Sequence, residues 1–330
     1  MPTKCLFRAA KPLGTAFKMS AQRAYPEMRA AFTTKRNFSM SDGTPYFEPA
    51  PTASIAVVSA IAPTGFLRVA INTTNEVLVS FPKVGAPEVP GPKTEYQGVA
   101  PDVARLLAEA LGVGLVIVPF DNPSELAATA ETEQWDIAVL GIEPVRAEII
   151  DFTAPMLEID ATFAVPPSSH LMQPIDDVSE GFGEVLHDDL LQRVDKPGVR
   201  IAVAVNSAYD LWLSRSLKQA TLVRGGGGEE DGGDRHMAAL DLARSGDSEG
   251  AIGALAGLRP WLKKHVAPMG WSLMPGRFTV IEQALGQPRR CADSTGMFFL
   301  ESFVRDLKTS GRMQLLLEKH GVQEMASVAK

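Results

Sequence analysis

Arg146 follows a run of apolar residues that ends in a glycine. Residues 137–140 are wholly apolar, and Gly141, Ile142 and Pro144 come before Arg146. Such a run is typical of a buried parallel strand, and open α/β sheets bind ligands beyond the carboxyl ends of their strands. The guanidinium group offers five N–H donors in a planar fork that fits a carboxylate or a phosphate. We therefore expect Arg146 to bind an anionic group, with the backbone of Gly141 and Ile142 beside it. The alternative is a salt bridge to Glu143, Glu148 or Asp151.

A second candidate anion site lies at residues 206–209, where a predicted strand is followed by a helix. Ser207 and Ala208 stand at the expected start of that helix. The first backbone N–H groups of a helix have no partner within the helix, and together with a hydroxyl group they can hold an anion. The Ser207 side chain alternatively caps its own helix, and the two roles are compatible.

Further polar residues follow two other predicted strands. Asn72 and Thr73 come directly after the first strand, and Asp121 ends the second. Each is a candidate for lining the same ligand site, whereas a polar loop or, for Asp121, a helix cap explains them equally well. Arg259 opens a late helix and is also a candidate, although a surface cation is the simpler interpretation there.

The elements that position these residues alternate between strands and helices. This alternation predicts parallel sheets joined by right-handed crossovers, and its restart near residue 162 predicts a second α/β domain. The predicted strands are residues 67–71, 115–120, 137–140, 162–165, 200–205, 221–223 and 251–255. The predicted helices are residues 99–111, 124–133, 207–217, 236–245, 258–265 and two within 294–319, separated by Gly311.

The sequence contains none of the motifs typical of metal sites, serine hydrolases or phosphate-binding loops. The five histidines are scattered without the spacing of metal ligands, and no Gly-x-Ser-x-Gly motif is present. The glycine run 225–228 lacks the Lys-Ser/Thr of a phosphate-binding loop, which favours a surface insertion. We expect neither a metal nor a cofactor.

Composition and charge narrow the class of protein further. A chain of 330 residues, 45% hydrophobic and 22% charged, is long enough for two domains. The net charge of −7 gives no electrostatic support for nucleic-acid binding, and no apolar run reaches the roughly 20 residues of a membrane span. The only cysteines are Cys5 and Cys291, which fits a reducing compartment.

The N-terminal segment differs in charge from the rest of the chain. Residues 1–41 contain eight lysines and arginines but only one acid, Glu27. A basic, acid-poor leader is typical of an organellar transit peptide, and cleavage after Phe38 would fit a mitochondrial one. An extension without a targeting role, and hence a cytoplasmic protein, is the alternative. We expect residues 1–51 to lie outside the folded domains and the proline-containing residues 42–64 to form a linker, with the fold beginning near Phe66.

Four segments together resemble the bacterial extracellular solute-binding proteins of family 3, the amino-acid-type binding subunits of importers. They are Leu67–Ile71, Gly98–Ala104, Trp135–Ala138 and Arg146–Met156, and they occur in the order that the family has. The segment 246–251 is similar to a degraded form of the family's late Gly-x-x-Asp-Ala motif. The resemblance implies a two-lobed type II periplasmic-binding-protein-like fold, with each lobe a mostly parallel sheet flanked by helices. It places the first lobe at 66–161 plus 275–330 and the second at 162–274, joined by a hinge that closes on ligand.

The resemblance also carries expectations for the site. Arg146 matches the arginine that grips a ligand carboxylate, and the turn at Ser207 matches the one that meets the ligand from the second lobe. Amino-acid binders of the family place an acid for the α-ammonium group where Ala254 is counted in this chain. Without that acid an ammonium group would be costly to bury, which favours an anionic metabolite.

Two further functions are compatible with the same scaffold. One is a cyclohexadienyl or arogenate dehydratase-like enzyme, for which Glu143 or Glu158 is a candidate general acid. The other is a scaffold that has lost its ligand. We favour binding without catalysis. The basic leader conflicts with delivery to a membrane importer, so the sequence identifies no transport partner.

Overall fold

The computed structural model describes residues 53–80, 96–167, 169–172, 187–226, 234–291 and 293–330. The predicted leader, almost all of the loop at 82–97 and most of the glycine run after Gly225 lie outside these residues. Within the described part, no helix is long and apolar enough to cross a membrane.

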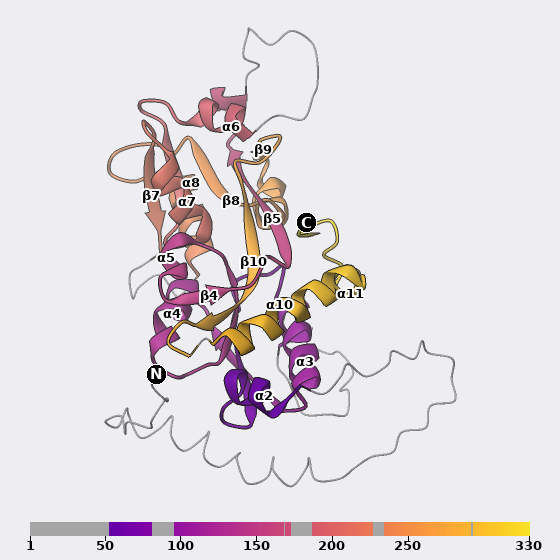
Figure 1. The fold of residues 1–330 in the computed structure, drawn as a ribbon. Helices are drawn as coiled ribbons and strands as arrows, with labels where there is room; N and C mark the ends of the chain where they lie inside the picture. The colour runs from indigo at the N-terminus through magenta and orange to yellow at the C-terminus, as the bar shows by residue number, and fades with distance from the viewer. Residues whose placement is uncertain (1–52, 81–95, 168, 173–186, 227–233, 292) are drawn as a thin grey trace. The chain divides into compact units, whose positions relative to one another are not determined.

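Three parallel strands form one end of the sheet (Figure 1). They are β1 (Phe66–Asn72), β2 (Gly114–Phe120) and β3 (Ile137–Gly141), with Val69 opposite both Ile117 and Ile137. Helix α3 (Val99–Leu111) joins β1 to β2 and ends at Gly112, whose φ of 68° is the left-handed conformation that glycine adopts most easily. These elements confirm the predicted strands and helix. We call β1–β4 and α3–α5, together with the C-terminal helices, the first lobe.

A second parallel set forms the other end of the sheet. It contains β6 (Arg200–Ala204), β7 (Thr221–Gly225) and β8 (Ala254–Leu258), with helices α7 (Ala208–Ser216), α8 (Arg235–Ser245) and α9 (Arg259–His265). We call this set the second lobe. The strand predicted at 251–255 begins three residues later, because Asp247 and Gly250 first form a tight turn with backbone hydrogen bonds in both directions. Helix α6 (His187–Val194) precedes β6.

Two long strands, β5 (Leu157–Val165) and β10 (Thr279–Pro288), run antiparallel between the two sets. The strand order is β2-β1-β3-β10-β5-β8-β6-β7, so each lobe is parallel only away from this central pair (Figure 1). β10 was not predicted, because Glu282, Gln283 and Gln287 interrupt its apolar residues. Both strands supply residues to more than one hydrophobic core. The predicted lobe boundaries at 161–162 and 274–275 stay predictions.

Each lobe has its own buried core. The larger core of the first lobe lies between the sheet and α3, with Leu67, Leu107 and Val304 fully buried, and a smaller one around Trp135 and Leu140 covers the opposite face. The core of the second lobe contains Phe163 and Phe278, whose ring centroids are 4.5 Å apart.

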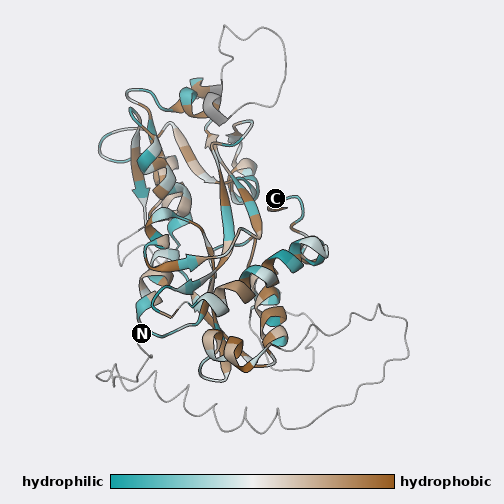
Figure 2. Cartoon of the chain, in the orientation of Figure 1, coloured by the Kyte–Doolittle hydropathy of each residue, from teal (hydrophilic) through white to brown (hydrophobic). Residues whose placement is uncertain are grey.

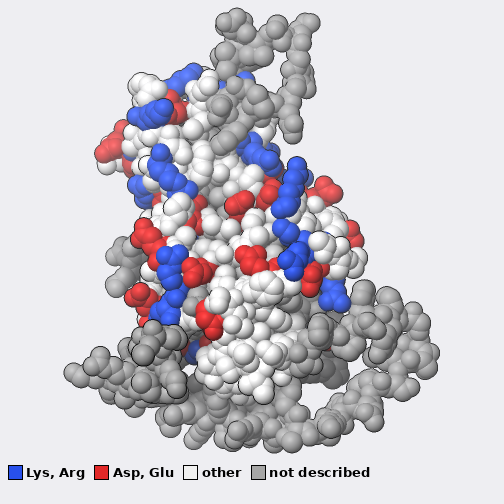
Figure 3. Space-filling view, viewed as in Figure 1, with Lys and Arg blue, Asp and Glu red and all other residues white. Residues whose placement is uncertain are grey.

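One predicted linker is in fact a helix. α2 (Ile55–Ile61) is capped by Ser54 and packs against α10 (Ser294–Thr309), with Ile61 fully buried in the first core. The expectation that the fold begins near Phe66 is therefore wrong, because the apolar side chains of α2 outweigh the flanking prolines. Figure 2 shows α2 coloured mainly as hydrophobic, and Figure 3 shows a white surface without Lys, Arg, Asp or Glu over α2.

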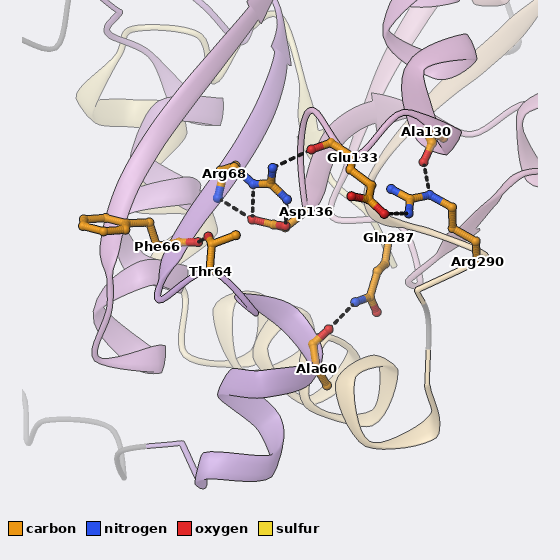
Figure 4. A network of polar contacts seen from close by, with 9 residues as sticks. All are labelled: Ala60, Thr64, Phe66, Arg68, Ala130, Glu133, Asp136, Gln287 and Arg290. Carbon is orange, nitrogen blue, oxygen red and sulfur yellow. Dashed lines mark hydrogen bonds and ion pairs between the residues drawn. The ribbon is translucent and has the colours of Figure 1, made fainter. Parts of the chain in front are cut away.

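A polar network connects the amino ends of β1 and β3 in the first lobe (Figure 4). Asp136 accepts hydrogen bonds from the Arg68 backbone N–H at 2.9 Å and from its Nε at 3.0 Å, and it pairs with Nη2 at 2.5 Å. The Asp136 carboxylate therefore ties the start of β3 to β1. In the same view the Gln287 amide donates to Ala60 O at 2.8 Å, which links β10 to α2.

The remaining elements are short. They are α4 (Pro123–Ala128), α5 (Pro144–Ala147), α11 (Arg312–Lys319), β4 (Ile150–Phe152), β9 (Ser272–Leu273), β11 (Ser327–Val328) and three 3₁₀ turns at Thr129–Glu131, His170–Met172 and Ala267–Met269. As predicted, Gly311 separates the two C-terminal helices, with φ of 77°.

Candidate functional site

The carboxyl ends of β1, β3 and β8 meet at one cavity, which we call the cleft cavity. Its volume is about 50 Å³, enough for a few waters or a small ligand. Residues of both lobes line it, and none of the lining residues in the described part of the chain is an aspartate or a glutamate. The lining residues are Asn72, Thr74, Asn75, Leu78, Val79, Ala100, Pro123, Val139, Leu140, Gly141, Arg146, Ser207, Ala208, Tyr209, Arg235, His236, Leu258, Ile281 and Gln283.

Arg146 lies in this cavity and is 4% exposed. Its Nη1 donates to the Gly141 carbonyl at 2.9 Å, and its Nη2 lies 3.4 Å from the carbonyl of Asn206 in the second lobe. Its Nε is buried without a hydrogen-bond partner. The backbone carbonyls thus orient the guanidinium group but do not neutralise it.

The salt bridge considered as an alternative for Arg146 does not form among the described residues. Glu143 pairs instead with Arg215 of α7 at 2.6 Å, Asp151 pairs with Arg289 at 2.9 Å, and Glu148 is exposed. Burial is the largest effect on the pKa of Arg146 and, together with the nearby charge of Arg235, lowers it to about 10 against the opposing charge of Glu143. Arg146 is still charged at neutral pH, so the cavity contains a buried cation without an ion-pair partner.

The turn at residues 206–209 reaches the cavity from the second lobe. Asn206 has φ of 57°, and its carbonyl accepts from Ser124 Oγ at 3.2 Å as well as lying near Arg146. Ser207 caps α7 by accepting from Asp210 N at 3.1 Å, which confirms the capping interpretation, and it also lines the cavity with Ala208.

The other predicted site residues divide between three places. Asn72 and Gly141 line the cleft cavity. Thr73 and Asp121 line a second cavity of about 550 Å³ that shares Thr74, Val79 and His236 with the first. Asp121 does not cap α4, because Asn122 does so by accepting from the backbone N–H groups of Ser124 and Glu125.

Ile142 and Arg259 are not brought into the cleft cavity. The Ile142 N–H donates to Glu282 O at 2.8 Å within the sheet, so it is not offered to a ligand. Arg259 lines a separate cavity with Glu158 and Asp160, and its guanidinium lies 3.9 Å from Asp160 and bonds to the Gly276 carbonyl. The two candidate general acids are also absent from the lining of the cleft cavity, since Glu158 lines this separate cavity and Glu143 pairs with Arg215.

Sequence reasoning missed Arg235, a second buried arginine of the cleft cavity. It is 5% exposed and is the first residue of α8. A cation is unfavourable at a helix N-terminus because it repels the helix dipole. An arginine at the first position of a helix is therefore the one sequence feature that would have indicated a special role for Arg235.

His236 and Tyr209 of the cavity were also missed, because nothing in their sequence neighbourhood sets them apart. Burial lowers the pKa of His236 to about 4, with Arg235 adding to the effect, so the imidazole is neutral at pH 7. Burial raises the pKa of Tyr209, which keeps its hydroxyl protonated. The positive charge of the cavity therefore comes from Arg146 and Arg235 alone.

The position counted for an ammonium-binding acid needs correction. Ala254 is fully buried at the start of β8, whereas the β8 residue that lines the cavity is Leu258, at the carboxyl end. Counting from the degraded glycine motif went wrong because the turn at Asp247–Gly250 delays the strand. The corrected residue is still not an acid. Among the described residues, no three His, Cys, Asp or Glu side chains are grouped as metal ligands.

The fold is similar to that of several solved binding proteins. An ancestral amino acid-binding protein, a precursor of cyclohexadienyl dehydratase, is 19% identical with a TM-score of 0.55, and the match covers 79% of this chain and 98% of that one. A putative binding component of an ABC transporter from Wolinella succinogenes, complexed with lysine, is 18% identical with a TM-score of 0.54, covering 77% and 95%. The GluR0 ligand-binding core with L-glutamate is 16% identical with a TM-score of 0.53, covering 77% and 96%. No curated protein sequence matches the chain.

These likenesses define the class of the fold, a two-lobed α/β protein of the type II periplasmic-binding-protein kind, as the sequence predicted. The sequence profile of the bacterial extracellular solute-binding proteins, family 3, matches residues 87–323, which is more than half of the chain. The chain belongs to that family.

Proposed function

We propose that the protein binds a small carboxylate-bearing metabolite in the cleft cavity. The observation that carries this proposal is the guanidinium group of Arg146, which is buried, oriented by the Gly141 carbonyl, and has no carboxylate partner among the described residues. A charge buried without a partner is unfavourable, and an anionic ligand would remove that penalty. Charge-assisted bonds to a planar guanidinium are about twice as strong as neutral hydrogen bonds.

The same cavity argues for a ligand without a free ammonium group. Structural relatives are described with lysine and with L-glutamate, and both of these ligands carry one. Among the described residues, the lining contains two arginines and no acid, and Leu258 occupies the end of β8. Three acids line the adjoining second cavity: Glu76 pairs there with Lys264 at 2.7 Å, Asp234 caps α8, and Asp121 is exposed. We therefore propose an organic acid, such as a 2-oxo acid, in preference to an α-amino acid.

Matched pairs of acids test both parts of the proposal. Isothermal titration of the full chain would compare 2-oxoglutarate with L-glutamate and pyruvate with L-alanine, in wild type, Arg146→Gln and Arg289→Gln. Arg289 is a suitable control because it is half-exposed and pairs with Asp151 in the same lobe. We expect the oxo acid of at least one pair to bind more tightly, and Arg146→Gln alone to abolish binding. Binding that Arg146→Gln leaves unchanged would remove Arg146 from the site.

We also propose that the basic segment 1–51 directs the chain to mitochondria. The support is its charge, with eight lysines and arginines against one acid in residues 1–41. A fluorescent protein fused behind residues 1–51 would enter mitochondria if the proposal is right. Diffuse fluorescence in the cytoplasm would contradict it.

A further inference from the structure

Arg235 brings a second buried cation into the cleft cavity, from the lobe opposite Arg146. Its Nη1 donates to the Val205 carbonyl at 3.0 Å, and its Nη2 lies 3.4 Å from the Asp121 carbonyl. Its Nε is buried without a partner, as is that of Arg146. Carbonyls at the ends of two strands therefore hold the group in place without cancelling its charge.

Among the described residues, the acids next to Arg235 are engaged elsewhere or exposed. Asp234 uses its side chain to accept from the backbone N–H groups of His236 and Met237, and it is 57% exposed. Asp121 is exposed and lines the second cavity. Neither forms an ion pair with Arg235 within 4.0 Å. Burial lowers the pKa of Arg235, and the charges of Asp121 and Asp234 oppose this shift without reversing it.

Each of the two arginines makes the charged form of the other less favourable. Both line the same small cavity, and the charge of Arg235 lowers the pKa of Arg146. Like charges held in a desolvated space repel, and a single negative charge would leave one of them uncompensated. Two negative charges on one ligand would neutralise both, and they would also bridge the first lobe to the second.

We propose that Arg235 forms a second anion subsite and that the ligand is a small dicarboxylate, bound with one carboxylate on Arg146 and the other on Arg235. This inference rests on the proposed function, because it takes Arg146 as the first subsite. The size of the cavity, about 50 Å³, favours a short carbon chain. Ser207 and Ala208, at the start of α7, lie in the same lining, although the Ser207 backbone N–H already donates to Ala204 O at 3.2 Å.

The test uses three acids of equal length on the full chain. Succinate carries two carboxylates, succinamate replaces one with a neutral amide, and butyrate replaces it with a methyl group. Titrations would use wild type, Arg235→Gln, Arg146→Gln and the control Arg244→Gln. Arg244 lies on the same helix as Arg235, but it is 58% exposed and does not line the cavity.

We expect wild type and Arg244→Gln to bind succinate at least tenfold more tightly than succinamate or butyrate. Arg235→Gln should remove that preference and leave the monoanions bound as before. Equal affinity of wild type for succinate and the monoanions would overturn the inference without needing any variant to fold. Equal weakening of all three acids by Arg235→Gln would also overturn it, since that would indicate a structural role. If wild type binds all three acids equally and Arg146→Gln abolishes that binding, the proposed function stands and only the second subsite fails. If no carboxylate binds wild type, both fail.

Discussion

The carboxylate of Glu143 lies 2.6 Å from the guanidinium group of Arg215 and so joins the N-terminus of α5 in the first lobe to α7 in the second. Glu143 stands three residues before Arg146, and its charge acts on the Arg146 guanidinium group. Because Arg215 takes this carboxylate, Arg146 keeps its donors for a ligand. Burial raises the pKa of Glu143, although the Arg215 pair opposes the effect. The ion pair thus connects the two lobes, and it holds the Glu143 carboxylate on Arg215 and not on Arg146.

Removing Arg215 should weaken ligand binding from a distance. In Arg215→Ala the Glu143 carboxylate loses its partner and is free to pair with Arg146, with which it already interacts electrostatically. We expect the dissociation constant for a carboxylate ligand to rise about tenfold, which corresponds to about 1.4 kcal/mol. Titration calorimetry measures this. The double variant Arg215→Ala/Glu143→Gln should recover most of the affinity, and a double variant as weak as Arg215→Ala would show that the explanation is wrong.

Replacing Arg146 by methionine should stabilise the protein without ligand while abolishing binding. The folded state keeps a buried cation with no carboxylate partner, and burial disfavours its charge, as its pKa of about 10 indicates. An apolar side chain of similar length removes that penalty, which we expect to raise the free energy of unfolding by about 1–3 kcal/mol. Urea denaturation measures the change. A lower unfolding free energy for Arg146→Met would mean that the carbonyl contacts outweigh the charge penalty.

The pKa of Asp102 predicts how stability depends on pH. Burial raises the pKa of this carboxyl group, but hydrogen bonds from Lys319 and His320, both at 2.7 Å, outweigh that effect and hold it below its ordinary value of 3.8. A carboxyl group whose folded pKa is depressed stabilises the fold above its unfolded pKa and loses that contribution as the pH falls through the folded pKa. We therefore expect stability to fall below about pH 4, and less steeply in Asp102→Asn.

The measurement for Asp102 is the urea midpoint at pH 6 and at pH 3. Glu109→Gln on the same helix is the control, because Glu109 is exposed. Asp102→Asn should be less stable than wild type at pH 6 and close to it at pH 3. An equal loss of stability between pH 6 and pH 3 in wild type and in Asp102→Asn would contradict the assignment of this pH dependence to Asp102.

From the polar network of Figure 4 we predict a variant that loses stability but keeps its affinity for carboxylates. In Asp136→Asn the Arg68 guanidinium loses its carboxylate partner, and the tie between β1 and β3 is weakened. We expect a loss of about 1–3 kcal/mol in unfolding free energy, because the Asp136 side chain is 5% exposed. The more exposed pair of Asp151 and Arg289 is the comparison, and Asp151→Asn should cost less than about 1 kcal/mol. Carboxylate affinity should change in neither variant.

Most of the fold and one half of the candidate site were predictable from sequence. The strand at 137–140, the glycine after it and Arg146 form a local pattern, so the place of Arg146 beyond a strand end followed directly. The predictions that failed concern residues whose environment is set by parts of the chain far away in sequence. β10 carries polar residues because it lies between two lobes, and the helical residues of α2 were hidden by prolines on either side. Thr73 and Arg259 had the right residue types after the right elements, but their side chains turn to other cavities.

The sequence by itself determined the alternation of strands and helices, the family and the arginine that follows β3, because each depends on residues close together in the chain. Only the tertiary structure decided that Arg146 stays without an ion-pair partner, that Arg215 takes Glu143, and that Arg235 shares the cavity. These outcomes depend on which side chains meet when β5 and β10 bring the two lobes together. The charge of the cavity is a sum over residues that are distant in sequence, and the proposal of an anionic ligand rests on this sum.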